Sequence, residues 1–375
     1  MSALAACGDG EPTAIAIDAA AIDAAAIDAA AIDAAVDAAP PPCVVTAAFD
    51  LGRVDRIEID TAAVTTAAGW LFGNRIVEPN VGVVGAAWTL IDFAGQRVVA
   101  PVDLPDGPPV LAVNGDRALV GYTTADGAQV QLLTADGAAV GAAITVPTSA
   151  SVADAVAGPG TGFRVLVRVA TSEALGVSLA HLDRDGVVAS LAPVAVPVEA
   201  LQRLHTSTAL ASGAVALAYD RTRGFDACFA CAVGGVAALG LDDQLAATWA
   251  VPLFDHHSSA ITSLAEIDGT LYTTWLSNAP GPHLPFRFGA VARVPDGPVL
   301  TLSESAVVVV AGGPRAGVIG VHTMGRAYLQ TFDAGFTLGT ACSVDVRPSK
   351  LLAVGDDAVL VIGDEGEARV VTLQP

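Results

Sequence analysis

Basic residues are scarce in this chain of 375 residues. It contains a single lysine, Lys350, and its 18 lysine and arginine residues face 39 acidic ones, which gives a net charge of −21. An acidic surface repels nucleic-acid phosphates and anionic lipid headgroups. We therefore expect no nucleic-acid partner and no docking on membranes through basic side chains.

Aromatic residues and long apolar runs are also scarce. Aromatics make up 5% of the residues although 53% are hydrophobic, so a core must be built from Ala, Val and Leu. The longest apolar runs, such as 306–312, have the length of a strand and are too short to span a bilayer. Membrane association would therefore need a separate anchor.

The sequence also lacks the common catalytic motifs. It has no G-x-S-x-G, no H-E-x-x-H, no phosphate-binding loop and no dinucleotide fingerprint. Acidic turns such as 183–186 and 355–358 lack the spaced ligands of a calcium loop and fit hairpin turns better. These observations favour a protein without a cofactor and leave enzymatic activity open.

A low-complexity segment occupies residues 8–42. The motif AIDAA repeats there with isoleucine every five residues, which spreads the isoleucines around all sides of a helix instead of forming a stripe. Three prolines, 40–42, end the segment. We interpret 1–7 as part of a signal, 8–42 as an acidic spacer and 43–375 as the folded domain, with an adhesive helix as the alternative for the spacer.

Residues 43–375 read as short apolar strands separated by turn signals, and two kinds of strand pair alternate. Asp-Gly and related turns between apolar runs favour hairpins because these turns need positive φ. One kind of pair occurs at 88–105, 130–147, 177–197, 236–253, 290–302 and 327–344. The other kind occurs at 110–124, 207–220, 261–277, 306–323 and 350–364.

The repeating unit therefore holds four strands, and its turn markers are 38 to 57 residues apart. This pattern resembles the β-propeller architecture, and the length accommodates seven blades. Residues 350–373 supply about three strands and 44–60 a fourth, so both termini would close the last blade. A pair of stacked β-sandwiches is the alternative.

The chain has five cysteines, and setting Cys7 aside leaves an even number, which is typical of disulfides in an oxidising compartment. We expect one disulfide between Cys228 and Cys231 and another between Cys43 and Cys342. The second would join the first strand to the penultimate blade. Metal binding or redox activity at Cys228 and Cys231 are the alternatives.

The expected register places several histidines and charged residues on one face of the propeller, around blades four and five. This face carries the loops between blades and those between the second and third strands of a blade. Histidine and carboxylate groups together can bind a metal or transfer protons, although polar loops on a wet face need no such role. The candidate ligand-binding residues are His205, Arg221, Arg223, Asp255, His256, His257, His283 and Arg287.

Leu4, Ala5, Ala6 and Cys7 precede the spacer directly. This segment resembles the lipobox of bacterial lipoproteins, in which the cysteine receives a lipid after cleavage. The basic and apolar regions of such a signal are missing, so we expect the true start to lie upstream. The resemblance implies a membrane anchor on Cys7 and a location in the cell envelope, periplasmic or on the outer surface; a chance LAAC would leave the protein cytoplasmic.

Three functions fit these features. The first is a tethered propeller that binds a protein or glycan partner. The second is an extracytoplasmic enzyme or metal-binding protein that uses the loop face. The third is a scaffold of the envelope. Since propellers serve all three functions, the fold alone does not choose among them.

Overall fold

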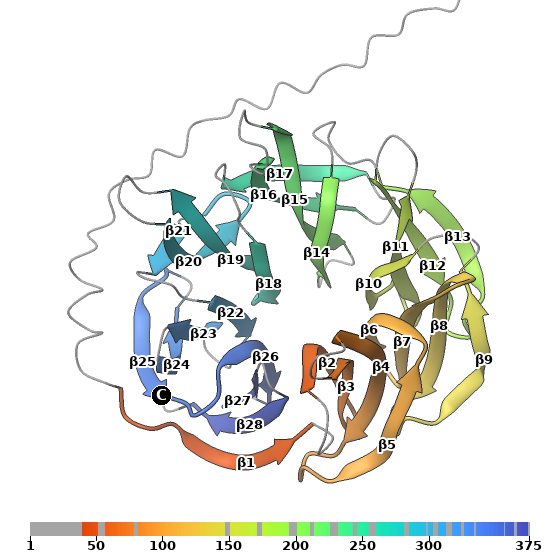
Figure 1. Ribbon diagram of the computed structural model, residues 1–375, viewed down its shortest axis with the longest axis horizontal. Coiled ribbons are helices and arrows are strands. Elements are labelled where there is room, and N and C mark those ends of the chain that lie inside the picture. Colours follow the sequence, from red (N-terminus) through yellow and green to blue (C-terminus); the bar gives the residue numbers. More distant parts are fainter. Residues whose placement is uncertain are drawn as a thin grey trace, which may run out of the picture. The chain divides into compact units, whose positions relative to one another are not determined.

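A computed structural model gives the fold. It describes residues 40–51, 57–78, 82–146, 151–170, 175–194, 201–210, 214–225, 232–242, 246–254, 260–280, 285–297, 299–302, 307–312, 317–323, 326–333, 335–355, 357–363 and 366–373. Every regular element among these residues is a strand, and the strands form seven antiparallel sheets of four. The sheets are the blades of a seven-bladed β-propeller, which confirms the predicted fold class (Figure 1).

Blades 1 to 6 each take four consecutive strands, which run from the centre of the ring to its rim. Blades 1 to 3 consist of β2 (Ile57–Thr66), β3 (Gly69–Glu78), β4 (Gly82–Ile91), β5 (Arg97–Leu104); β6 (Asp106–Asn114), β7 (Arg117–Thr124), β8 (Gly127–Thr134), β9 (Ala139–Thr145); and β10 (Ser151–Ala157), β11 (Phe163–Ala170), β12 (Leu175–Leu182), β13 (Val188–Pro193). Blades 4 to 6 consist of β14 (Leu201–Ala209), β15 (Val215–Phe225), β16 (Ala232–Leu241), β17 (Ala247–Phe254); β18 (Ala260–Ile267), β19 (Thr270–Pro280), β20 (Pro285–Val294), β21 (Val299–Leu302); and β22 (Val307–Gly312), β23 (Gly317–Thr323), β24 (Arg326–Phe332), β25 (Leu338–Ser343).

Blade 7 is completed by both ends of the domain. β26 (Pro348–Val354), β27 (Ala358–Gly363) and β28 (Glu367–Thr372) come from its C-terminal end, and β1 (Val44–Asp50) pairs antiparallel with β28 as the outermost strand. The predicted closure by both termini is therefore confirmed. One detail was wrong: residues 44–60 do not make one strand, because β1 ends at Asp50 and β2 of blade 1 begins at Ile57.

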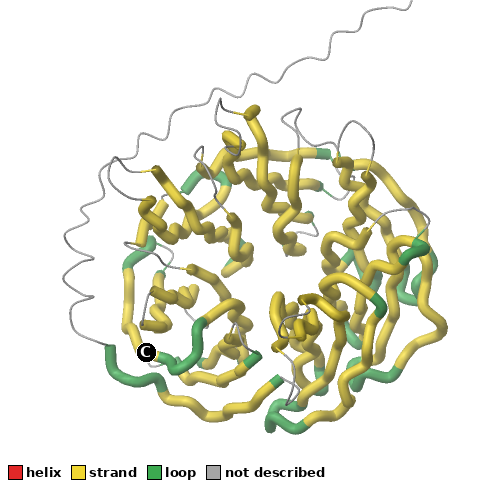
Figure 2. The backbone as a smooth tube through the Cα atoms, viewed as in Figure 1, coloured by secondary structure: helices red, strands yellow, loops and turns green. Residues whose placement is uncertain are grey.

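The middle strands of the blades carry the core, because a neighbouring blade covers each of their two faces (Figure 2). In β27 every residue is buried, whereas the rim strand β1 alternates between exposed and half-buried residues. This explains why the middle strands read as continuous apolar runs. Small and branched residues such as Leu166 and Leu217 pack blade 3 against blade 4 in one cluster.

An aspartate organises many of the turns between the third and fourth strands. Asp183 Oδ1 accepts hydrogen bonds from the backbone N–H groups of Asp185 and Val187, at 2.9 and 2.8 Å, and Gly186 adopts a φ of 84°. The turn after Asp92 repeats this arrangement. In blade 6 the positive φ of 61° falls on Phe336, which follows Gly335, and the Phe336 ring stacks on Phe332.

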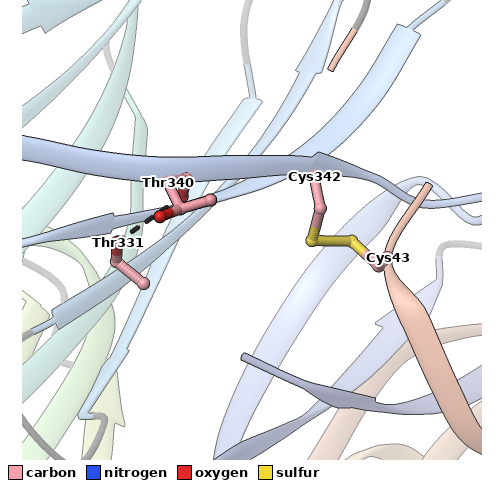
Figure 3. The surroundings of a disulfide bond; sticks show 4 residues. All are labelled: Cys43, Thr331, Thr340 and Cys342. Atoms are coloured by element: carbon pink, nitrogen blue, oxygen red, sulfur yellow. Dashed lines mark hydrogen bonds between the residues drawn. A yellow bond between two sulfur atoms is a disulfide. The ribbon is translucent and has the colours of Figure 1, made fainter. Parts of the chain in front are cut away.

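A disulfide fastens the closing strand to the neighbouring blade. Cys43, directly before β1, is bonded to Cys342 in β25 of blade 6, as predicted (Figure 3). The backbone N–H of Cys43 donates to the Ser343 carbonyl oxygen at 2.8 Å, and the N–H of Ser343 donates to the Pro41 carbonyl oxygen at 2.7 Å. Residues 41–43 therefore extend blade 6 with a short parallel bridge before the chain enters blade 7.

Candidate functional site

The structure assigns four of the candidate ligand-binding residues to strands and does not describe the others. His205 belongs to β14, Arg221 and Arg223 to β15, and Arg287 to β20, so these strands extend farther than expected from the sequence. The side chains of these four residues lie outside the described part of the chain. Four further candidates also lie outside the described residues, namely Asp255, His256, His257 and His283. The same holds for Cys7, Cys228 and Cys231.

The described strand ends that flank several candidate residues lie at one end of blades 4 and 5. In blades 4 and 5 the second strand leads to the third, β15 to β16 and β19 to β20, at the end where the inner strands β14 and β18 begin. The residues between these strand ends, 195–200, 226–231, 255–259 and 281–284, lie outside the described residues, and the grouping of the candidates on one face stays a prediction.

Two other site types were searched within the described residues. No group of three or more His, Cys, Asp or Glu residues there could hold a metal ion. Among the same residues, no helix has the length and apolar character needed to cross a membrane.

The inner strands share a feature that the sequence did not predict. In six of the seven blades the inner strand carries a register shift relative to the second strand, four or five paired residues before the hairpin turn. Such β-bulges bend a strand and change the direction of the side chains beside them. The residues that resume pairing after the shift are Ala62, Val110, Asp154, Thr206, Ser263 and Lys350.

These residues form a level around the propeller axis, since the inner strands β2, β6, β10, β14, β18, β22 and β26 contact one another in sequence around the ring. We call the part of the propeller around its axis, to which these seven inner strands belong, the axial region (Figure 1). Its described side chains at this level carry two opposite charges, on Asp154 in blade 3 and Lys350 in blade 7. His205 occupies the bulge in β14 directly before Thr206.

Asp154 and Lys350 can approach each other only through the axial region. β10 packs against β6 and β14, and β26 packs against β22 and β2, so blades 3 and 7 have no common interface. Yet the negative charge of the Asp154 carboxylate favours the charged form of Lys350 and by itself would raise the pKa of the Lys350 ammonium. Both side chains are partly exposed, so solvent reaches them.

Burial has the larger effect on Lys350 and lowers the pKa of its ammonium below the usual 10.5, against the pull of Asp154. A lysine that is largely surrounded by protein loses part of its hydration, and this disfavours the charged form. Among the described residues, no hydrogen bond or ion pair joins the Lys350 Nζ to a protein atom. Within the described part of the chain, the Lys350 amine is therefore not neutralised by direct contact.

The sequence offered only one signal for this site. Lys350 is the single lysine of the chain and lies within an expected apolar strand pair, 350–364. Asp154 gave no signal, because its segment, 151–170, was not among the predicted strand pairs. Nothing in the residue pattern shows that two strands so distant in sequence carry charges at one level of the ring.

We expect the Lys350 amine to titrate as a single group below pH 10.5, because burial is the dominant influence on its pKa. Reductive methylation with ¹³C-formaldehyde would give one side-chain signal, since the chain has one lysine, and its chemical shift can be followed by NMR against pH. Asp154→Asn should lower the midpoint further, because it removes the charge that raises the pKa. A midpoint at or above 10.5 would contradict the described environment.

Comparison with known proteins identifies the architecture. No family model matches the chain, and no curated protein matches its sequence. Similar structures include Drosophila Plexin A in complex with Semaphorin 1b, with 9% identity, a TM-score of 0.53 and coverage of 89% of this chain and 88% of that one. The polysaccharide lyase Uly1 has 9% identity, a TM-score of 0.53 and coverage of 84% and 90%.

A protein of unknown function from Dyadobacter fermentans is similar at 11% identity, with a TM-score of 0.52 and coverage of 89% of this chain and 100% of that one. At such low identity these likenesses establish the propeller fold alone. The partners and reactions named for those proteins therefore do not define the role of this chain, which has to be argued from its own residues.

Proposed function

We propose that this protein is a lipid-anchored, extracytoplasmic β-propeller that acts as a binding module of the cell envelope, with its ligand site in the axial region. The observation that carries the binding role is the pair of opposite charges, Asp154 and Lys350, that two non-adjacent blades present to this region at one level. A carboxylate and an ammonium held on separate blades can each contact a ligand in addition to the contacts that they make within the protein.

The stability consequence of Lys350 supports this role. The pKa of its amine is lowered in the folded state, so below pH 10.5 the unfolded chain binds the proton more tightly than the native protein does. Lys350 therefore lowers the stability of the fold at neutral pH. A residue that lowers the stability of the fold, in a strand without any other charged residue, is typical of a functional position.

We expect Lys350→Met to raise the thermal unfolding midpoint at pH 7, because methionine fills similar space without a buried charge. The difference from wild type should shrink as the pH approaches 10.5, where the unfolded state also loses its proton. Calorimetry at pH 7, 9 and 10 would measure this trend. A lower midpoint for the variant at pH 7 would show that Lys350 stabilises the fold and would remove this support.

Two features support the envelope location. The Cys43–Cys342 disulfide is typical of proteins from oxidising compartments. The lipobox-like segment ending at Cys7, followed by an acidic spacer, has the order expected of a tethered envelope protein. The anchor explains how a chain with net charge −21 could remain at an anionic membrane.

The location is tested by expressing the full gene with its upstream codons in a Gram-negative host. We expect the protein in the membrane fraction, with a lipid on the peptide that begins at Cys7 by mass spectrometry, and release into the soluble fraction for Cys7→Ser. Glu11→Gln serves as a control that changes a nearby residue of the spacer without removing the anchor. An unmodified Cys7 in a cytoplasmic protein would overturn the proposed location.

The binding role is tested separately, through the single lysine. Amines, carboxylic acids, neutral sugars and amino acids are each added to the purified propeller, and acetylation of Lys350 by a water-soluble ester is followed by mass spectrometry. At least one class should slow acetylation and raise the unfolding midpoint, and Lys350→Met should lose the second effect. If no class does either, the axial region is not a binding site.

A further inference from the structure

We propose that the axial region binds a small zwitterion, such as a free amino acid, whose carboxylate contacts the Lys350 ammonium and whose ammonium contacts the Asp154 carboxylate. This inference rests on the proposed binding function and adds the class of ligand. It is carried by the placement of the two residues, directly after the bulges of β26 and β10, in blades that do not touch.

The strand pairing shows from which interface of the ring each side chain starts. Lys350 is paired with Ile362, whose side chain packs with residues of blade 1, so Lys350 leaves β26 on the side of that blade. Asp154 is paired with Leu166, which packs against blade 4. The two charges therefore project from different interfaces of the ring, and the electrostatic effect of one on the other acts across the axial region.

A ligand that carries both charges satisfies this arrangement better than a simple ion. An anion on Lys350 would be repelled by Asp154, and a cation on Asp154 would be repelled by Lys350. A simple anion would also have to approach a protein of net charge −21, whereas a zwitterion has no net charge to be repelled. Charge complementarity thus selects a molecule with a positive and a negative group at opposite ends.

The other described side chains of the level are uncharged. Ser263 Oγ is hydrogen-bonded to Thr274 Oγ1 at 2.6 Å and has further acceptor capacity for a ligand ammonium. Ala62 and Val110 stand at the equivalent positions of blades 1 and 2, pack partly against the apolar clusters between neighbouring blades and add no charge to the level. Asp154 also interacts with another group of the protein, but a carboxylate offers about four acceptor positions and can bind a second donor.

The test uses the free L-amino acids together with their N-acetyl and amide derivatives, which lack the ammonium and the carboxylate respectively. Isothermal titration calorimetry with the full chain should show that at least one free amino acid binds. Each blocked derivative should bind at least about tenfold more weakly, because a charged hydrogen bond contributes about 1.5 to 3 kcal/mol.

Single substitutions assign each contact. Lys350→Gln should remove the preference for the free acid over the amide, and Asp154→Asn should remove the preference for the free amine over the N-acetyl form. Combining Asp154→Lys with Lys350→Asp should recover binding that either change alone abolishes. Arg184→Gln is the matched control, since it breaks an exposed ion pair with Asp116 away from the axial region and should change nothing.

The outcomes separate the ligand class from the binding role. If a neutral sugar or a simple acid protects Lys350 while no amino acid binds, the zwitterion proposal is overturned and the binding function stands. Equal affinity for an amino acid and its amide likewise contradicts the proposed contact with Lys350. Failure of every compound class to protect Lys350 would overturn both.

Discussion

Loss of the Cys43–Cys342 disulfide is expected to lower the free energy of unfolding by about 5 kcal/mol. The two cysteines are 299 residues apart, so the bond closes nearly the whole propeller into one loop. In the chain-entropy model, closing a loop of this length restricts the unfolded chain enough to give a stabilisation of about 5 to 6 kcal/mol. This is the largest effect that we expect from any change of side chains in the fold.

The structure shows which contacts surround the disulfide and which contacts of β1 would remain without it. The disulfide packs against the cluster between blades 6 and 7, which includes Val346 and Leu351. Without it, β1 is held by its ladder with β28 and by the hydrogen bonds between residues 41–43 and Ser343. The free energy should therefore fall while the blades keep their structure, so far-ultraviolet circular dichroism should not change.

The measurement is urea unfolding of the double variant Cys43→Ser and Cys342→Ser beside the wild-type protein. Reductant should bring the wild type close to the stability of the double variant. The same comparison in a background with Cys228→Ser and Cys231→Ser removes any contribution from the second expected disulfide. That comparison separates the disulfide from the serine substitutions themselves. Equal midpoints for oxidised wild type and the double variant would show that the bond does not stabilise the propeller.

The blade pattern could be predicted because turn chemistry is local. Asp92 and Asp183 precede glycines with positive φ, and each aspartate binds the backbone of its own turn. Such turns look alike wherever they occur, so their spacing marked the blades. Two inner hairpins, β2 with β3 and β10 with β11, were not among the predicted strand pairs; their turns, Ala67-Ala68 and 158–162, do not contain Asp-Gly.

The candidate site could not be predicted in the same way, because it depends on register between distant strands. A bulge is one unpaired residue, such as Ala153 in β10, and it has no distinctive composition. Asp154 and Lys350 are almost two hundred residues apart, and only the closure of the ring brings both to the axial region. Local sequence propensity therefore could not predict that Asp154 and Lys350 lie at the same level of the ring.

Gly69→Ala is the second change with a large expected effect. Gly69 begins β3 with a φ of 152°, and an added methyl group would overlap the carbonyl oxygen of Ile91 in the neighbouring strand. That oxygen belongs to the ladder of β3 with β4, in which Trp70 pairs with Ile91, and it cannot move away like the end of a flexible side chain. We expect a loss of about 3 kcal/mol from strain and overpacking together.

Gly115→Ala provides the matched control. Gly115 lies in the hairpin between β6 and β7, the corresponding turn of the next blade, with a φ of 61° and open space where its Cβ would be. It should lose only about 1 kcal/mol, the cost of a left-handed conformation for alanine. Urea unfolding of both variants would measure the difference. Similar losses for the two would mean that backbone conformation, and not the contact with Ile91, requires glycine at the start of β3.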